Sequence, residues 1–275
     1  MTRDATIIEL AQWLATPAGR YLLQWEQQQL DVAVVDLFGF HALQLGLPEL
    51  DALRTNRMPH RWLASDVDRV DSLPLIAAED ETTPSQPPVV LQCDFDALPF
   101  PAASLDLVVL PHTLELARDP HRALREVERV LVPDGRIVVV GLNPASLFGL
   151  RQRMGQMKHR LGLGDGRLFL PHAGEFIGYW RLRDWLRLLS FEVDRGRFGC
   201  YRPPFRTQRW LERLGWLEDT GDRWWPVLGA VYFLVATKRV RGMRLVGLAR
   251  NEVPKAHAAP AVVTNRNHRT HNHDE

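Results

Sequence analysis

The sequence predicts an α/β protein in which a largely parallel sheet is covered by helices. Two runs of aliphatic and β-branched residues, 105–110 (LDLVVL) and 137–141 (IVVVG), read as strands buried on both faces, which is typical of a parallel sheet. A helix is predicted between them, because Leu124, Val127 and Leu131 repeat at helical spacing. Strand, helix and strand in this order form a βαβ unit, and functional loops are expected at the carboxyl ends of its strands.

The ends of these elements are also marked in the sequence. Asp119 can cap the N-terminus of the helix, Pro120 suits its first turn, and residues 133–135 (PDG) predict a turn before the next strand. A short apolar run at 89–92 reads as a further strand, and it ends shortly before Asp94. The chain therefore contains at least three strands and a capped helix between residues 89 and 143.

The same stretch carries a resemblance to a known family. The pattern D-x-x-x-LPF…S-x-D-x-V, followed by DP…E-x-x-RVL-x-P-x-G, resembles the core of class I S-adenosylmethionine-dependent methyltransferases of the type 11 group. The resemblance implies a Rossmann-like, seven-stranded, doubly wound sheet with helices on both faces and an antiparallel last strand. It also implies S-adenosyl-L-methionine as the cofactor. The matching residues are Asp94, Leu98, Pro99, Phe100, Ser104, Asp106, Val108, Asp119, Pro120, Glu126, Arg129, Val130, Leu131, Pro133 and Gly135.

Composition and charge narrow the classes of function. Hydrophobic residues make up 45% and charged residues 24% of the chain, as in ordinary globular proteins. Lys and Arg number 34 against 33 Asp and Glu, so no overall charge favours nucleic acid or a membrane. The two cysteines, Cys93 and Cys200, make neither a disulfide framework nor a metal site. No signal-peptide core or transmembrane run is visible, so a cytoplasmic protein without a membrane partner is expected.

The chain is predicted to have three parts. Residues 1–39 form an N-terminal helical segment, 40–240 the methyltransferase-like domain, and 241–275 a basic, disordered tail. Within the domain, residues 144–180 read as a cap-like insertion without a regular element. Further strands are expected at 41–46, 61–65, 191–193 and 230–237, with an amphipathic helix over 182–189.

Two segments suggest binding partners. Residues 151–167 hold five basic residues against one acid, Asp165, so they could attract an anionic methyl acceptor, although such charge runs are more often solvated faces. Aromatic and basic residues alternate over 199–222. This alternation suits a nucleic-acid strand, a small-molecule pocket or a packed surface helix, and the balanced charge makes nucleic acid the less favoured partner.

The loop expected to hold the cofactor departs from the family pattern. In the family the first strand ends in an acid, and a glycine series then lets the backbone approach the cofactor. By the resemblance, this chain keeps Gly46 with Leu47 beside it, while Gln44, Pro48 and Leu50 replace the acid and two later glycines. An alternative alignment on residues 36–40 (DLFGF) keeps an acid but places aromatics at glycine positions. In either alignment the glycine-rich motif is degenerate.

Other site residues follow from the resemblance. Asp94 would accept a hydrogen bond from the adenine amino group, Phe95 would add backbone and stacking contacts, and Asp66 would pair with the ribose hydroxyls. Pro111 and His112 lie where the family places the methionine portion and the substrate entrance. From the residues alone, Asp94 could instead cap its own turn. His112 could be a general base, because imidazole titrates near neutrality, or a structural residue.

The predicted function is methyl transfer from S-adenosylmethionine to an unidentified acceptor. Such a reaction mainly requires the methyl group and the nucleophile to be in line, so the lack of a catalytic triad or metal cluster in the sequence does not count against an enzyme. The alternative is a non-catalytic binding or scaffold protein that kept the fold after losing cofactor binding. The degenerate glycine loop favours that alternative, and the sequence leaves the acceptor and the oligomeric state open.

Overall fold

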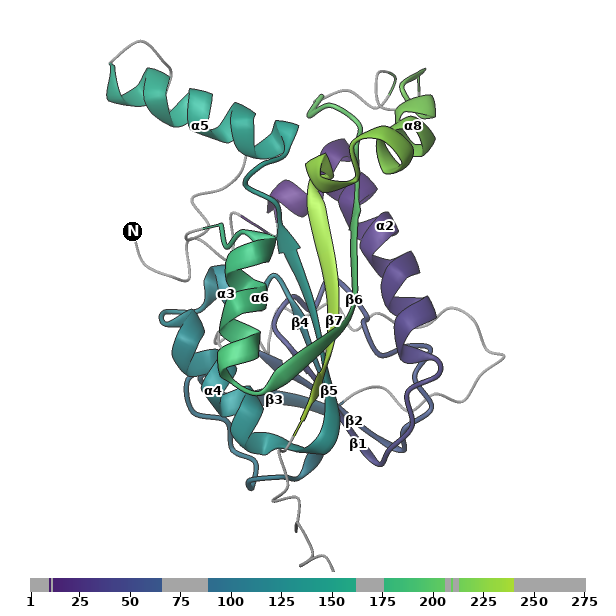
Figure 1. Cartoon of the computed structure of the whole chain (residues 1–275), viewed down its shortest axis with the longest axis vertical. Coiled ribbons are helices and arrows are strands. Elements are labelled where there is room, and N and C mark those ends of the chain that lie inside the picture. Colours follow the sequence, from purple (N-terminus) through teal and green to yellow (C-terminus); the bar gives the residue numbers. More distant parts are fainter. Residues whose placement is uncertain are drawn as a thin grey trace, which may run out of the picture. The chain divides into compact units, whose positions relative to one another are not determined.

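The computed structural model describes residues 10, 12–65, 89–161, 176–205, 209 and 213–239, and its centre is one seven-stranded sheet (Figure 1). The strand order is β3-β2-β1-β4-β5-β7-β6. β7 is antiparallel to both β5 and β6, while the other four pairs are parallel. The predicted sheet is therefore confirmed. The strands are β1 (His41–Leu45), β2 (His60–Ser65), β3 (Val89–Gln92), β4 (Leu105–Pro111), β5 (Leu131–Leu142), β6 (Phe191–Gly199) and β7 (Val231–Lys238).

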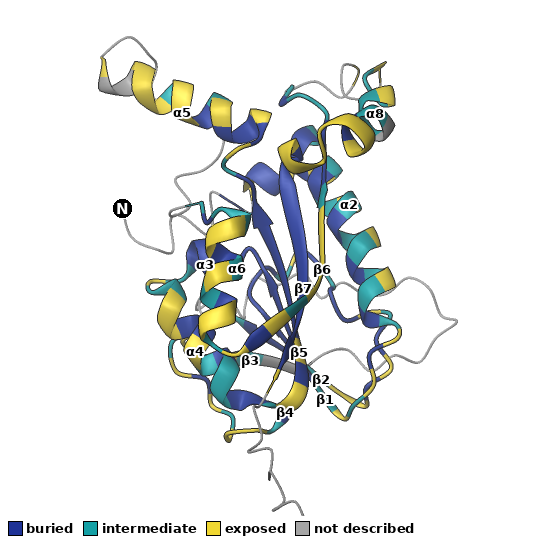
Figure 2. Ribbon diagram, in the orientation of Figure 1, coloured by how far each residue is buried: buried dark blue, intermediate teal, exposed yellow. Residues whose placement is uncertain are grey.

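Helices cover both faces of this sheet. α2 and residues 47–58 pack on one face, and α4 and α6 pack on the other, as Figures 1 and 2 show. Each face has its own apolar core, because alternate residues of the central strands point to opposite sides. The helices are α2 (Pro17–Val34), α3 (Thr113–Leu116), α4 (Pro120–Val130), α5 (Leu147–Arg160), α6 (Tyr179–Leu188) and α8 (Trp216–Trp224), with a 3-10 helix η2 (Pro226–Leu228).

Local sequence explains where the two best-marked helices begin. Asp119 caps α4 as predicted, because its Oδ1 accepts hydrogen bonds from the amides of His121 and Arg122 at 2.9 and 3.1 Å. α2 begins in the same way: Thr16 Oγ1 accepts a hydrogen bond from the amide of Gly19 at 3.2 Å, and Pro17 occupies the first turn. No helix of the described part of the chain is long and apolar enough to cross a membrane.

The connection from β1 to β2 has no helix. Residues 46–59 form a series of turns instead. A parallel connection usually carries a helix that covers the sheet, so this face must be covered by other residues. α2, which precedes β1 in the chain, does so with Leu22, Leu30 and Val34, all fully buried.

Three elements differ from the prediction. β6 continues to Gly199, well beyond residue 193, because it pairs with β7 along its full length. β5 begins at Leu131, so the PDG turn lies inside it, and the pairing with β4 shifts register there. α5 fills part of the insertion in which no regular element was expected. Its glycines and its exposed apolar residues hid the helical period.

All described residues belong to one compact unit that runs to Val240. Residues 1–9 and 11 of the predicted N-terminal helical segment and the whole predicted tail, 241–275, lie outside the described residues. At the end of the unit, the Lys238 ammonium donates hydrogen bonds to the carbonyl oxygens of Glu128 and Leu131 at 2.5 and 3.0 Å. Arg239 pairs with Glu192 and Asp134 at 3.0 and 2.8 Å. The last residues of β7 are thereby tied to α4 and to β5.

We expect Lys238→Met to lower the free energy of unfolding by about 1.5–3 kcal/mol, because two backbone carbonyls lose a charged donor. The shift of the urea midpoint measures this loss. Arg195→Met is the matched control, since Arg195 is exposed on β6, and it should leave the midpoint in place. Equal midpoints for both variants would contradict the stabilising role of Lys238.

Candidate active site

The ends of three strands converge around Gly46. The order of the strands reverses between β1 and β4, because β2 and β3 lie on one side of this pair and β5 lies on the other. Ligands of such folds bind at the carboxyl ends of the strands at this reversal. Gly46 follows β1 with a φ of +74°, and a Cβ built there would meet Phe95 Cζ at 3.4 Å and Thr113 Oγ1 at 3.5 Å. Phe95 follows β3 and Thr113 follows β4. Glycine suits this position because the backbone is left-handed, whereas the space around it would admit a Cβ in ordinary van der Waals contact.

Gln44 holds the loop after β1 in place. Its side-chain amide donates to the carbonyl oxygens of Gly46, Leu47 and Leu50 at 3.2, 3.0 and 2.6 Å. Its Oε1 accepts from the amide of Ala52 at 2.9 Å. Gln44 is 3% exposed, so its side chain serves the loop rather than a ligand. A carboxylate, the family's residue here, could not donate to three carbonyls.

The other predicted cofactor residues are divided between surface and core. Asp94 is exposed, and its Oδ1 accepts from the Asp96 amide at 3.1 Å, so it does cap its own turn. Leu47, with a φ of +42°, turns its side chain into the core. Phe95 is buried against the opposite core, and Pro111 is buried at the end of β4. Asp66 lies outside the described residues.

His112 lies in a buried network with two glutamates. Its Nδ1 is 2.9 Å from Glu115 Oε2, and its Nε2 is 2.9 Å from Glu26 Oε1. Glu115 Oε1 also accepts a hydrogen bond from the amide of Leu142 at 2.5 Å. All three side chains of this network are at most 2% exposed. The network joins α2, the end of β4, the first turn of α3 and the end of β5.

The charges around His112 determine its protonation. Burial is the strongest influence and lowers the pKa of His112, but the charges of Glu26 and Glu115, with their hydrogen bonds, outweigh it and raise the pKa to about 10. The imidazole is then protonated at neutral pH and donates through both nitrogens. An imidazolium bonded in this way has no lone pair with which to accept a proton, which weighs against a general-base role.

The network has more acceptors than donors. Glu26 Oε2 is buried and has no hydrogen-bond partner among the described residues. One imidazolium faces two carboxyl groups, so it can balance only one negative charge. Buried carboxyl groups with an unpaired oxygen are costly and are most common at functional sites.

A second polar cluster lies beside the first, at the ends of β6 and α8. The Tyr21 hydroxyl donates to Glu218 Oε2, and Glu218 Oε1 accepts from the amide of Cys200 at 2.9 Å. The Arg202 guanidinium lies 4.7 Å from the centre of the Tyr21 ring. Burial raises the pKa of Cys200, and the charges of Glu218 and Glu26 raise it further. The thiol is therefore held neutral and is not an activated nucleophile.

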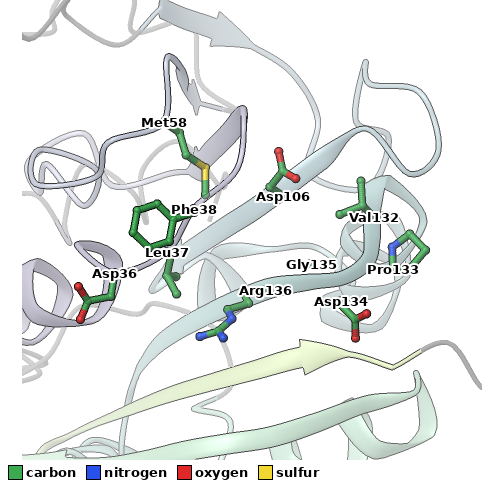
Figure 3. A pocket seen from close by; sticks show the side chains of 10 residues that line it. All are labelled: Asp36, Leu37, Phe38, Met58, Asp106, Val132, Pro133, Asp134, Gly135 and Arg136. Atoms are coloured by element: carbon green, nitrogen blue, oxygen red, sulfur yellow. The ribbon is translucent and has the colours of Figure 1, made fainter.

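A cavity of about 320 Å³ opens at the other end of the strands, on the amino-terminal side of the sheet (Figure 3). Phe38, Met58, Asp106 and the turn 132–136 line it. These residues lie at the amino ends of β1, β4 and β5, away from the strand ends at which such folds bind ligands. Asp106 Oδ2 already accepts from the amides of Phe40 and His41 at 2.8 and 2.9 Å. The cavity is therefore separate from the candidate active site.

Sequence reasoning missed Glu26 and Glu115. The signal for Glu26 was present, since Leu22, Glu26, Leu30 and Val34 follow one another at intervals of four residues and form one buried face of α2. A lone acid within such a face requires a buried partner. The partner, His112, is 86 residues away, and only the fold brings the two together.

The strand order, the antiparallel β7 and Gly46 at the end of β1, where the strand order reverses, together define a class I methyltransferase fold. Residues 56–139 match the family model Methyltransf_11, described as "Methyltransferase domain". The chain is therefore similar to methyltransferases of the type 11 group over these residues, and that family implies S-adenosylmethionine as cofactor.

The chain also resembles other proteins in sequence and in fold. "Uncharacterized protein YafS" of Escherichia coli K12 is 29% identical over 234 residues, which cover 85% of this chain and 83% of the relative. Among solved structures, the complex of the Haloferax volcanii Trm112 methyltransferase activator with a methyltransferase matches with a TM-score of 0.56 at 17% identity, covering 88% of this chain and 99% of that one. An S-adenosylmethionine-dependent methyltransferase of Thermotoga maritima matches with a TM-score of 0.55 at 18% identity, covering 81% and 91%. The two structures support the fold.

We expect Gln44→Glu to destabilise the protein, although it restores the family's acid. The new carboxylate would face three carbonyl oxygens and could donate to none of them, which should cost about 2–4 kcal/mol of the free energy of unfolding. Urea unfolding measures this cost. Gln24→Glu, on the exposed side of α2, should be nearly neutral. An unchanged midpoint for Gln44→Glu would show that the loop does not depend on the amide.

The His112 network should weaken as the pH rises. The pKa of His112 is about 10 in the folded protein against 6.5 for the free side chain. The network therefore contributes fully to the free energy of unfolding below pH 6.5, and this contribution is lost as the pH approaches 10. At about 1.4 kcal/mol per pKa unit, the loss amounts to several kcal/mol.

Urea unfolding at pH values from 6.5 to 10 measures this slope. His112→Asn suits the left-handed backbone (φ +52°) but cannot titrate, so the difference between wild type and variant isolates residue 112 from other titrating groups. A difference that stays constant with pH would contradict a protonated His112.

Proposed function

We propose that this protein binds S-adenosylmethionine at the carboxyl ends of β1, β3 and β4 and transfers its methyl group to an acceptor that enters beside residues 111–113. The observation that carries the proposal is that Gly46, Phe95 and Thr113 converge where the order of the strands reverses, between β1 and β4. At that point a glycine with positive φ is the residue that lets a backbone approach a ligand.

The residues present fit the cofactor in two respects. Gly46 has a φ of +74°, a conformation that glycine adopts readily, and it lies next to Phe95 and Thr113 at the ends of β3 and β4. Asp94 keeps an exposed carboxylate after β3, where it can accept a hydrogen bond from an amino group. One feature differs from the family pattern. The side chain of Gln44 is hydrogen-bonded to the loop, so only backbone groups are available to bind the ligand there.

The residues of this chain are expected to bind and orient rather than to transfer protons. Bound S-adenosylmethionine supplies an electrophilic methyl group, so the protein's main task is to align the acceptor with it. The protonated His112, fixed between Glu26 and Glu115, holds α2 against the ends of β4 and β5. His112 is then a positioning residue for the wall of the site and not its base.

The acceptor is proposed to approach from the end of the sheet at which α5 begins. α5 follows β5 after four residues, and its segment contains Arg151, Arg153, Lys158 and Arg160 but no acid. This charge favours an acceptor that is anionic or is presented on an anionic surface.

Asp94→Ala should weaken S-adenosylmethionine binding by about tenfold to a hundredfold, because a hydrogen bond to a carboxylate contributes about 1.5–3 kcal/mol. Gly46→Val should weaken it more, since valine would have to adopt a positive φ and lie against Phe95. Isothermal titration calorimetry with S-adenosylmethionine and its demethylated product measures both effects. Asp184→Asn, exposed on α6, is the matched control and should bind like the wild type.

Two outcomes would contradict the proposal in different ways. Wild-type protein that binds neither compound at millimolar concentration would favour the non-catalytic scaffold. Unchanged binding by Asp94→Ala, with a melting temperature equal to that of the wild type, would leave the cofactor in place but overturn the position given to its adenine.

A further inference from the structure

α5 carries an apolar stripe on its solvent side. Residues 147, 150, 154, 157 and 161 follow one another at spacings of three and four, which places them on one side of a helix. Their exposed fractions lie between 46% and 66%, and Figure 2 shows much of the helix as exposed. The opposite side holds Phe148 and Gln152, which are 1% and 2% exposed and anchor the helix to the domain. The stripe, Leu147, Leu150, Met154, Met157 and Leu161, therefore faces away from the core.

Positive charge flanks this stripe on both sides. At 3.6 residues per turn, Arg151 and Lys158 lie along one border and Arg153 lies along the other. Residues 147–160 contain no Asp or Glu. An apolar stripe bordered by Arg and Lys is the pattern of helices that lie in the surface of a bilayer, where the stems enter the acyl region and the charged ends reach the phosphates.

Further large apolar residues are exposed at the same end of the sheet. Asn143, just before α5, donates hydrogen bonds to the carbonyl oxygens of Val227 and Gly229 at 2.7 and 2.9 Å, which fixes η2 beside the start of α5. Tryptophan is favoured at the boundary between water and lipid. The exposed residues near η2 are Trp216, Trp224, Trp225, Val227 and Leu228, which are 42–69% exposed.

We propose that α5 docks this protein onto the surface of a bilayer that contains anionic lipids. The apolar stripe enters the lipid interface, and Arg153 and Lys158 lie at the level of the phosphates, while Arg151 donates a hydrogen bond to the carbonyl oxygen of Pro204 within the domain. The sequence predicts no membrane partner because it lacks a spanning run, but a helix that lies on a bilayer requires no such run. The inference does not depend on cofactor binding, since docking is measured without S-adenosylmethionine.

Two other occupants fit the stripe less well. A second copy of this chain, joined through the same face, would bring two cationic helices together, and neither helix has an acidic residue to compensate the positive charge. A nucleic-acid strand would use the basic residues but would leave the aliphatic stripe uncovered, because backbone phosphates offer it no apolar partner. An anionic bilayer satisfies both the stripe and its flanks.

Co-sedimentation of the full chain with vesicles tests the proposal. Wild-type protein should sediment with vesicles of phosphatidylcholine mixed with phosphatidylglycerol, should bind pure phosphatidylcholine far more weakly, and should be released by salt. Met154→Asp combined with Met157→Asp should weaken binding by at least tenfold. Arg153→Gln and Lys158→Gln should each weaken it by about fivefold.

The controls separate α5 from other apolar and basic surfaces. Val32→Asp on α2 and Leu188→Asp on α6 change residues that are 65% and 83% exposed, and both should bind like the wild type. Circular dichroism and urea midpoints confirm that each variant is folded. The proposal is overturned if the wild type ignores the mixed vesicles, if the α5 variants bind as tightly as the wild type, or if sedimentation shows a dimer that Met154→Asp dissociates while vesicle binding is absent.

Discussion

The buried contact between Glu26, His112 and Glu115 is the constraint on which the arrangement at the carboxyl ends of β4 and β5 depends. A charged imidazole between two carboxyl groups is stable in an apolar interior only when both hydrogen bonds are made, and removal of one partner leaves a buried charge uncompensated. α2 therefore cannot slide or rotate on the sheet without breaking the contact. Because Glu115 also accepts from Leu142, the same constraint fixes the ends of β4 and β5 relative to each other.

The loop after β1 keeps a defined backbone although its residues depart from the family pattern. One glycine remains where the backbone must adopt a positive φ, and the amide of Gln44 gathers the carbonyls of the residues that follow. A short connection without a helix then suffices, because α2 already covers that face. The departures that make the glycine motif look eroded are parts of one alternative arrangement of the loop.

Much of the fold could be predicted from the sequence, because buried strands and capped helices are encoded locally. The apolar runs of β4 and β7 and the Asp119 cap are examples. α5 could not be predicted in this way, since its apolar residues face solvent and its glycines weaken the helical signal. The site was only partly predictable. Gly46 and the strand ends follow from the motif, but the protonation of His112 depends on Glu26, a residue far away in the chain.

The anchoring of Lys238 and Arg239 determines how far the chain can be shortened before the sheet itself is damaged. Arg239 is bonded to Glu192 and Asp134, and the ammonium of Lys238 before it is fixed to two backbone carbonyls inside the domain. Removal of that lysine would uncover the end of α4 and the last pairing of β7 with β6 at once. A chain shortened to residue 239 would therefore keep these contacts, whereas a chain shortened to residue 237 would lose all of them.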